Sequence, residues 1–247
     1  MLFLMRIGIT SLQDQFKWLK YLKMLMEGKI YWGIALIAVL ILGVAFFQGD
    51  KPAERSDLPW HIGHPTADTS RIFGITLGLS NTNEAEQHFQ EAAKPILFKS
   101  PGGQLVVEAF FEQVNLAGLK ARVVLSIAVP EPELPGMFER GLRMNATGSG
   151  KEITMTPDDI ARVFTMPVSS LTYMPLVRLD DAVFIKRFGK PQLRLREKKN
   201  GVVHWLYPQN GLDIALGGEE KPVLQYVPPH EFDKLVDPLL ANGEIVK

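Results

Sequence analysis

An uncharged, largely apolar run of 18 residues, Ile30 to Phe47, constrains this chain more than any other feature of its sequence. As an α-helix the run would be about 27 Å long, which matches the roughly 30 Å hydrocarbon core of a bilayer. Tyr31 and Trp32 stand at its start, where interfacial aromatic residues are common. A buried core helix would show a polar face, and a cleaved signal peptide would have a shorter apolar region. We therefore expect an uncleaved signal anchor, with one transmembrane helix over residues 30–48.

The charges that flank this run predict its orientation. Residues 1–29 hold five basic residues against Asp14 and Glu27, whereas the stretch after the run is mixed in sign. Because positive charge favours the cytoplasmic side, we expect residues 1–29 to be a cytoplasmic basic segment. For a bacterial chain, the remaining residues would lie in the periplasm, attached to the inner membrane. A start at Met24 or Met26 is an alternative that removes most of the basic segment.

Composition excludes several classes of function. The chain has 27 basic and 27 acidic residues, so it lacks the concentrated positive charge that nucleic acid requires, and we expect no nucleic-acid partner. It has no Cys, which excludes a disulfide framework, a thiolate nucleophile, a Cys-ligated zinc and a lipidated Cys. Any anchor in the membrane must then be the apolar helix itself.

Residues 49–70 are rich in Pro, Asp, Ser, Thr and Gly and have no apolar periodicity, which predicts a linker. This stretch contains His61 and His64, two imidazoles at a spacing that can share a metal ion on a helix. Gly63 and Pro65 disfavour a helix there, so we expect no metal site and interpret the stretch as a linker whose Trp60 docks on the folded domain.

Beyond the linker, one pattern occurs twice. Residues 84–116 and 180–212 align without gaps at an offset of 96, with seven identities that include Lys94-Pro95 and Lys190-Pro191. We predict a duplicated module, with a first α+β repeat over residues 71–150 and a second over residues 151–247. The predicted fold class is α+β, with two antiparallel sheets that are each backed on one face by short helices.

Local signals place the elements of each repeat. In the second repeat, acidic residues open a short helix after Leu179 and Gly189 ends it; strands follow over residues 192–196, 202–207, 212–216 and 223–227. In the first, a helix N-capped by Thr82 runs to about Ala93 and strands follow over residues 96–99, 105–112 and 120–129. Residues 71–79 and 171–177 are predicted strands ahead of these helices. Thr156 and Pro157 start a further helix that ends near Phe164.

These residues resemble a known family. A helix that ends in Phe-Gly-Lys-Pro (188–191), a hairpin strand Val-Val-His-Trp-Leu-Tyr-Pro (202–208) and the segment Gly-Ile-Thr-Leu-Gly-Leu-Ser (74–80) are similar to the SmpA/OmlA (BamE-like) module of bacterial outer-membrane lipoproteins. The resemblance covers about 60 residues in each repeat. It implies a small helix-plus-sheet domain without catalysis that binds other envelope proteins. This chain differs from the family in its transmembrane anchor and in carrying two copies.

The sequence gives little support to catalysis. Paired acids occur at residues 158–159, 180–181 and 219–220, but helix first turns and a turn explain their positions. His204 is expected to be exposed, because strand alternation places it opposite Trp205 and Tyr207. We expect no catalytic residues, no cofactor and no metal ion. The rival hypothesis is a periplasmic hydrolase or metal-binding protein that uses His61 and His64, or His204.

Aromatic residues point instead to binding. Phe110, Phe111, Trp205 and Tyr207 occupy equivalent strands of the two repeats, and we expect half of them in the core and half exposed as anchors for a partner. The basic residues between Lys186 and Lys199 are interpreted as a solvated face, with an acidic partner or lipid headgroups as the alternative. We predict a membrane-anchored periplasmic binding or scaffold protein of the cell envelope. Its predicted partners are envelope or inner-membrane proteins and the lipid bilayer.

Overall fold

The computed structural model describes residues 58–66, 68–217 and 220–246, all of which belong to one compact unit, residues 53–247. The predicted cytoplasmic segment, residues 1–29, and the predicted transmembrane helix, residues 30–48, lie outside the described residues. Within the described part of the chain, no helix combines the length and the apolar character needed to cross a bilayer. The α+β class that we predicted is confirmed.

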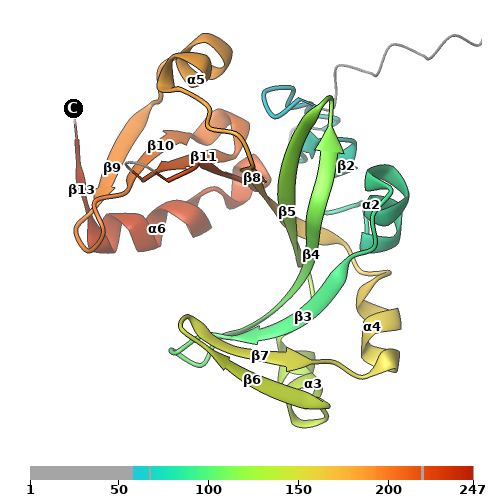
Figure 1. Cartoon of the computed structure of the whole chain (residues 1–247). Coiled ribbons are helices and arrows are strands. Elements are labelled where there is room, and N and C mark those ends of the chain that lie inside the picture. The colour runs from blue at the N-terminus through green and yellow to red at the C-terminus, as the bar shows by residue number, and fades with distance from the viewer. Residues whose placement is uncertain (1–57, 67, 218–219, 247) are drawn as a thin grey trace, which may run out of the picture. The chain divides into compact units, whose positions relative to one another are not determined.

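One antiparallel sheet of 11 strands forms the body of the unit (Figure 1). In order across the sheet, the strands are β13 (Gly243–Ile245), β9 (Leu193–Glu197), β10 (Val203–Tyr207), β11 (Leu212–Leu216), β12 (Val223–Tyr226), β8 (Val168–Pro175), β5 (Leu119–Ile127), β4 (Leu105–Leu116), β3 (Lys94–Lys99), β7 (Gly150–Thr154) and β6 (Arg143–Thr147). A separate hairpin joins β1 (Arg71–Ile72) to β2 (Ile75–Thr76).

The two predicted sheets are in fact one, and β8 is the reason. Strand β8 pairs with β5 from Ala121 opposite Pro175 to Ile127 opposite Val168. Its other edge pairs with β12, where Tyr173 lies opposite Leu224. Because β8 bonds on both sides, neither half of the sheet exposes an unpaired edge at the junction. The two predicted repeats therefore share a single hydrogen-bonded sheet.

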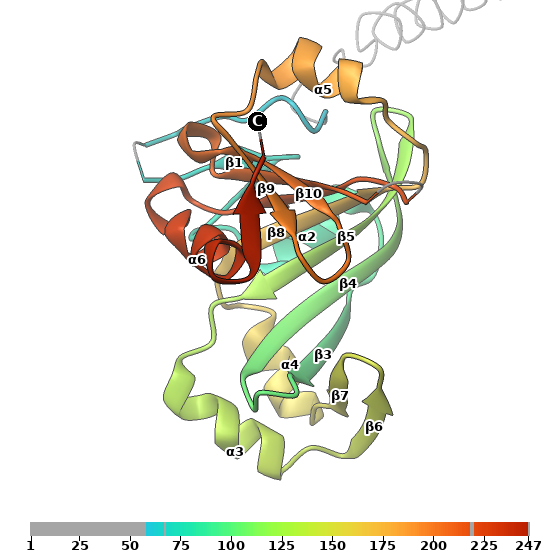
Figure 2. The ribbon, with the colours of Figure 1, turned by 90° about the vertical axis from the view of Figure 1, so that its left-hand side faces the viewer.

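The helices divide between the two faces of this sheet (Figure 2). Buried residues of α2 (Thr82–Phe89), α3 (Leu134–Glu139), α4 (Pro157–Val163) and α5 (Asp181–Phe188) join one large apolar core. Leu235, Val236 and Leu239 of α6 (Asp233–Asn242) instead pack with Leu195 and Leu206 in a smaller cluster on the other face. Short 3₁₀ helices lie at Glu131–Glu133 (η2), Pro208–Asn210 (η3) and Pro229–Glu231 (η4).

Most elements within residues 151–247, the second predicted repeat, lie where the sequence predicts them. Helix α5 ends at Phe188, and Gly189 follows it with a φ of 79°. The Thr156 side chain caps α4 by accepting a hydrogen bond from the backbone N–H of Asp159, and Pro157 is the first helical residue. These elements were predictable because Gly, Pro and capping residues act within a few positions of themselves.

The first repeat differs from the prediction at two places. Asn81, and not Thr82, caps α2 through its side chain, and the helix ends at Phe89 because Gln90 adopts a left-handed conformation with a φ of 54°. The predicted strand over residues 71–79 is wrong: a turn at Phe73 and Gly74 separates β1 from β2. Phe73 adopts a positive φ of 50°, and its fully buried ring packs against Tyr173 with centroids 4.9 Å apart.

A helix followed by three strands occurs in both halves, as α2-β3-β4-β5 and as α5-β9-β10-β11. The boundary that we predicted between residues 150 and 151 falls inside β7. From residue 58 on, the predicted linker packs against the domain, since the Pro59 carbonyl accepts a hydrogen bond from the Tyr226 hydroxyl at 2.8 Å. Elements α3, α6, β6, β7 and β13 were not predicted.

Two neighbouring aromatic residues of β4 provide a matched test of the two faces. Phe111 is 1 % exposed and its ring meets Phe89 edge-on at 5.0 Å, whereas Phe110 on the opposite face is half-buried. Phe111→Ala should lower the free energy of unfolding by about 3–5 kcal/mol, and Phe110→Ala by about 1 kcal/mol or less. Urea unfolding of the full chain in detergent measures both values. Equal losses would show that the assignment of faces is wrong.

Candidate functional site

The four aromatic residues predicted to contact a partner do not share one surface. Phe111, Trp205 and Tyr207 belong to the large core and are 1 %, 6 % and 5 % exposed. The Tyr207 hydroxyl donates to the Gly189 carbonyl at 3.0 Å, and this bond fastens the end of α5 to the sheet. Phe110 is the one of the four that is half-buried, and it lies on the opposite face. Of these four aromatic residues, Phe110 is therefore the one that can belong to a contact surface.

Phe110 belongs to a face of the sheet that is covered only in part. Residues that lie opposite one another in neighbouring strands share a face of the sheet. Stepping from strand to strand through such pairs leads from Phe110 on β4 to Leu206 on β10, by way of Val124, Thr172, Gln225 and Asp213. At Leu206 this face is covered by α6. The remaining helices with buried residues pack into the other core. Between β12 and β6, no described helix packs on this face.

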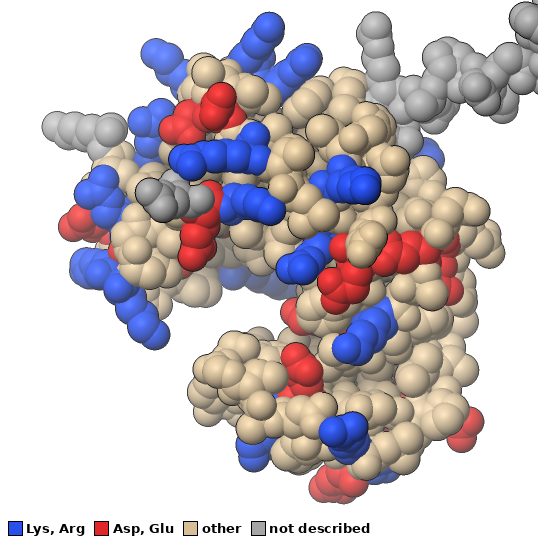
Figure 3. Space-filling view, in the orientation of Figure 1, with Lys and Arg blue, Asp and Glu red and all other residues tan. Residues whose placement is uncertain are grey.

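We call the uncovered part of this face the open face. Its half-buried apolar members come from β3, β4 and β5, and they are Ile96, Phe98, Val106, Phe110 and Val124. Half-buried polar residues of the same face include Glu108, Ser126, Glu152 and Thr172. In the space-filling view the domain is hollowed between the lobe that carries α6 and the β6–β7 hairpin (Figure 3). An apolar sheet surface in a hollow of this kind is characteristic of a site that contacts another molecule.

Glu108 is the unusual member of the open face. It lies at the centre of β4, opposite Ile96 on one side and Ser126 on the other. Burial raises the pKa of its carboxyl group, because the charged form loses water without gaining a partner. Among the described residues, no side chain forms a hydrogen bond or an ion pair with this carboxylate. A half-buried carboxylate that has no partner among the described residues is suited to a cation supplied from outside.

The prediction that His204 is exposed is wrong. Its side chain is buried, with Nδ1 2.7 Å from Asp213 Oδ2 and Nε2 3.1 Å from Glu197 Oε1. Alternation along β10 does place His204 opposite Trp205, as expected, but α6 covers that second face and removes it from water. The covering helix is distant in sequence, so a pattern read along β10 alone did not reveal it.

The three side chains form a hydrogen-bonded chain with the imidazole in the middle. Burial opposes the charged imidazolium, but the hydrogen bonds and charges of Asp213 and Glu197 outweigh this and raise the pKa of His204. Burial likewise raises the pKa of Asp213, against the opposing effect of His204. Because a carboxylate engages each ring nitrogen, neither nitrogen is free to act as a general base or as a metal ligand.

The other two histidines that the rival hypothesis invokes, His61 and His64, have different surroundings. His64 Nδ1 lies 3.3 Å from the Thr69 carbonyl on the surface, while the ring of His61 lies edge-on to Trp60 with centroids 6.5 Å apart. Within the described ranges, no three His, Asp or Glu side chains are arranged to hold a metal ion. Where the structure describes these histidines, it does not bring them together into one site.

The acidic pairs have structural roles where the structure describes them. Asp159 is 4 % exposed and accepts two hydrogen bonds from Arg140, at 2.8 and 2.6 Å. These bonds and the guanidinium charge lower the pKa of the Asp159 carboxyl group. Asp158 and Asp181 lie in the first turns of α4 and α5, as predicted, and Asp180 precedes α5. Residue 219 of the third pair lies outside the described residues.

The buried His204 predicts a pH dependence of stability. Its folded pKa lies above the ordinary value of 6.5, so its stabilising contribution is complete below 6.5 and is lost as pH rises through the folded pKa. The pKa of Asp213 is also raised, so this residue too contributes stability that is lost as pH rises, but in a lower pH range. The melting temperature should fall by on the order of a few degrees between about pH 6 and about pH 8.5. In His204→Gln this fall should disappear; a variant with an unchanged pH profile would contradict the assignment.

No protein-family model, curated protein or solved structure matches this chain. The resemblance of residues 74–80 and 188–208 to the SmpA/OmlA module therefore stays a prediction.

Proposed function

We propose that this chain is a single-pass, membrane-anchored binding protein of the bacterial cell envelope, which holds a partner polypeptide on the open face of its periplasmic sheet. The apolar run Ile30 to Phe47 supplies the anchor in this proposal, and the sheet supplies the contact surface. The SmpA/OmlA resemblance and the recurring order of helix and strands in the two halves support a non-catalytic, duplicated module.

One observation carries the proposal, namely the open face with its unpaired Glu108. Most of the neighbours of this carboxylate on the face are apolar: Ile96 lies opposite it on β3, and Val106 and Phe110 lie two residues away on β4, while Ser126 lies opposite it on β5. Leaving a carboxylate in such surroundings costs stability, so the arrangement is unfavourable for the domain alone. A partner that covers the apolar residues and brings a cation to Glu108 compensates that cost.

The chemistry of the face defines the partner. We expect an apolar polypeptide segment that carries a Lys or Arg, with the basic group placed at Glu108 and apolar side chains against Phe110 and Val124. A neutral apolar segment would leave the carboxylate buried and unpaired, and an acidic segment would add repulsion. The partner is thus an envelope or inner-membrane protein with a segment of this composition.

Site-specific crosslinking in living cells tests the proposal. A photo-crosslinking amino acid at Val124 should give one discrete adduct with a partner protein, because this position lies at the centre of the open face. The same amino acid at Gln87, exposed on α2 on the opposite side of the sheet, serves as the control. Adding Val106→Asp to the Val124 variant should reduce the adduct by about tenfold or more, since a second charge enters the apolar contact.

Two results would contradict the proposal. The first is an adduct pattern that is the same from positions 124 and 87, which would indicate random collisions. The second is an adduct from position 124 that persists undiminished with Val106→Asp, which would mean that the open face is not the contact surface. Resistance of the chain to extraction from membranes by alkaline carbonate tests the anchor separately.

Glu108→Gln should have opposite effects on stability and on binding. The folded pKa of Glu108 is raised, so its ionised form lowers stability as pH rises above the ordinary value of 4.5, and the amide removes this cost. We expect the melting temperature at neutral pH to rise by about 2 °C and the adduct from position 124 to weaken. Glu112→Gln on the same strand is the control, because its carboxylate lies at the surface beside Arg122. A Glu108→Gln variant that binds normally would exclude a cation contact.

A further inference from the structure

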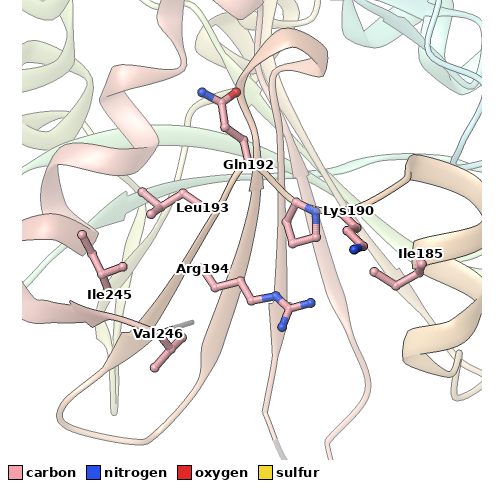
Figure 4. Close-up of a pocket in the computed structure, with 8 residues that line it drawn as sticks. Ile185, Lys190, Gln192, Leu193, Arg194, Ile245 and Val246 are labelled. Carbon is pink, nitrogen blue, oxygen red and sulfur yellow. The ribbon is translucent and has the colours of Figure 1, made fainter.

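A groove opens between α5, β9 and the C-terminal residues, at the end of the sheet where β13 and β9 lie (Figure 4). Its volume is about 650 Å³ and its walls combine basic and apolar side chains. Lys190 and Arg194 extend toward the same space beside Ile185. Ile245, on another wall, is 66 % exposed. A groove with cations and exposed apolar side chains suits an anionic amphiphile.

The groove is the centre of a larger basic surface. Between Arg178 and Lys199 there are eight basic and three acidic residues. One of these acids, Glu197, is engaged by His204. Lys and Arg side chains gather over α5 and the neighbouring end of the sheet in Figure 3. Among the described residues, Lys186 and Lys190 form no ion pair. We call Lys186, Arg187, Lys190, Arg194 and Arg196 the basic face.

Aromatic rings hold part of the basic face in place. The Arg194 guanidinium lies over the ring of Trp205, 4.6 Å from its centroid, and the Arg187 guanidinium lies over the ring of Trp60 at 4.5 Å. A guanidinium stacked in this way keeps its N–H groups available for phosphate oxygens. The two arginines are thus positioned before any ligand arrives.

The contact between Trp60 and Arg187 also shows where the chain joins the domain. Pro59 is fixed by its hydrogen bond to Tyr226, and Trp60 lies against α5, so the polypeptide enters the domain beside the basic face. Residues 49–57 separate the predicted transmembrane helix from Leu58. Nine residues span at most about 32 Å at full extension. The basic face is therefore confined to a short distance from the bilayer that carries the anchor.

We propose that the basic face docks on anionic phospholipid headgroups of the bilayer that anchors the chain, with the groove of Lys190 and Arg194 receiving a headgroup phosphate. This inference rests on the anchor in the proposed function, and it adds a second surface that is separate from the open face. Docking places the basic face against the lipid and leaves the open face available to a protein partner. Tethering assists docking, because the surface is held near the lipid without a separate binding event.

The absence of Cys from the chain makes a direct test straightforward. The full chain with Ala182→Cys, exposed on α5 one turn before Lys186, is labelled with a fluorophore and reconstituted into vesicles with a headgroup-attached quencher. We expect stronger quenching in vesicles that contain phosphatidylglycerol than in vesicles of phosphatidylcholine alone. A label at Ser149→Cys, in the turn between β6 and β7, should show no such difference.

Charge-reversed variants distinguish docking of the basic face from a nonspecific electrostatic attraction between the whole protein and the anionic vesicles. Lys186→Glu with Lys190→Glu should lower the docked fraction at position 182 by on the order of tenfold. Lys120→Glu with Lys151→Glu makes the same change in net charge at exposed positions elsewhere and should leave the quenching unchanged. If both double variants lose quenching equally, the inference is wrong and the effect is one of net charge.

Further outcomes separate this inference from the proposed function. A chain that remains in the vesicles after alkaline carbonate, but whose quenching does not depend on phosphatidylglycerol, overturns docking and leaves the anchor intact. A chain that carbonate extracts overturns both. If inorganic phosphate without vesicles produces the same change in the fluorescence of the label, the groove is a site for soluble anions and the docking proposal is wrong.

Discussion

The hydrogen bonds of β8 hold this domain together. With β5 on one side and β12 on the other, β8 joins two groups of strands that would otherwise present two exposed edges. Fully buried Tyr173 of β8 contacts Phe73, whose ring also meets Tyr226 edge-on, so the strand connects the core of both halves. Every other feature of interest depends on this continuity, because it brings Phe110 and His204 onto the same face of one sheet.

The two ends of that face differ because α6 covers one of them. Under α6, His204 bonds to Asp213 and Glu197 on neighbouring strands, while the second carboxylate oxygen of Asp213 has no hydrogen-bond partner among the described residues. Away from α6, Glu108 is half-buried and has no partner among the described residues. A buried carboxylate thus pairs with an imidazole where a helix covers the sheet, whereas Glu108 has no described partner where none does. This contrast, more than the apolar surface alone, identifies the open face as the place for a partner.

The structural features that depend on residues close together in the sequence were predicted correctly. Gly189 marked the end of one helix and Pro157 the start of another, and β9, β10 and β11 lie close to their predicted ranges. Features that depend on segments far apart in the sequence were not predicted. Nothing near β10 shows that α6 covers His204, and nothing near β4 shows that Glu108 lacks a partner. The aromatic pairs were correctly assigned to strands, but Trp205 and Tyr207 both entered the core because they are two residues apart and share a face.

The central claim is that the open face is exposed in the isolated protein and covered in the cell. The rate at which a thiol reagent modifies Val124→Cys, in the purified chain and in intact cells, tests it most directly, with Val123→Cys on the buried face as the reference. Our account predicts rapid modification of position 124 in the purified chain, protection of the same position in cells, and slow modification of position 123 in both. Equal rates at position 124 in both settings would contradict the existence of a partner, and slow modification in the purified chain would contradict the open face itself.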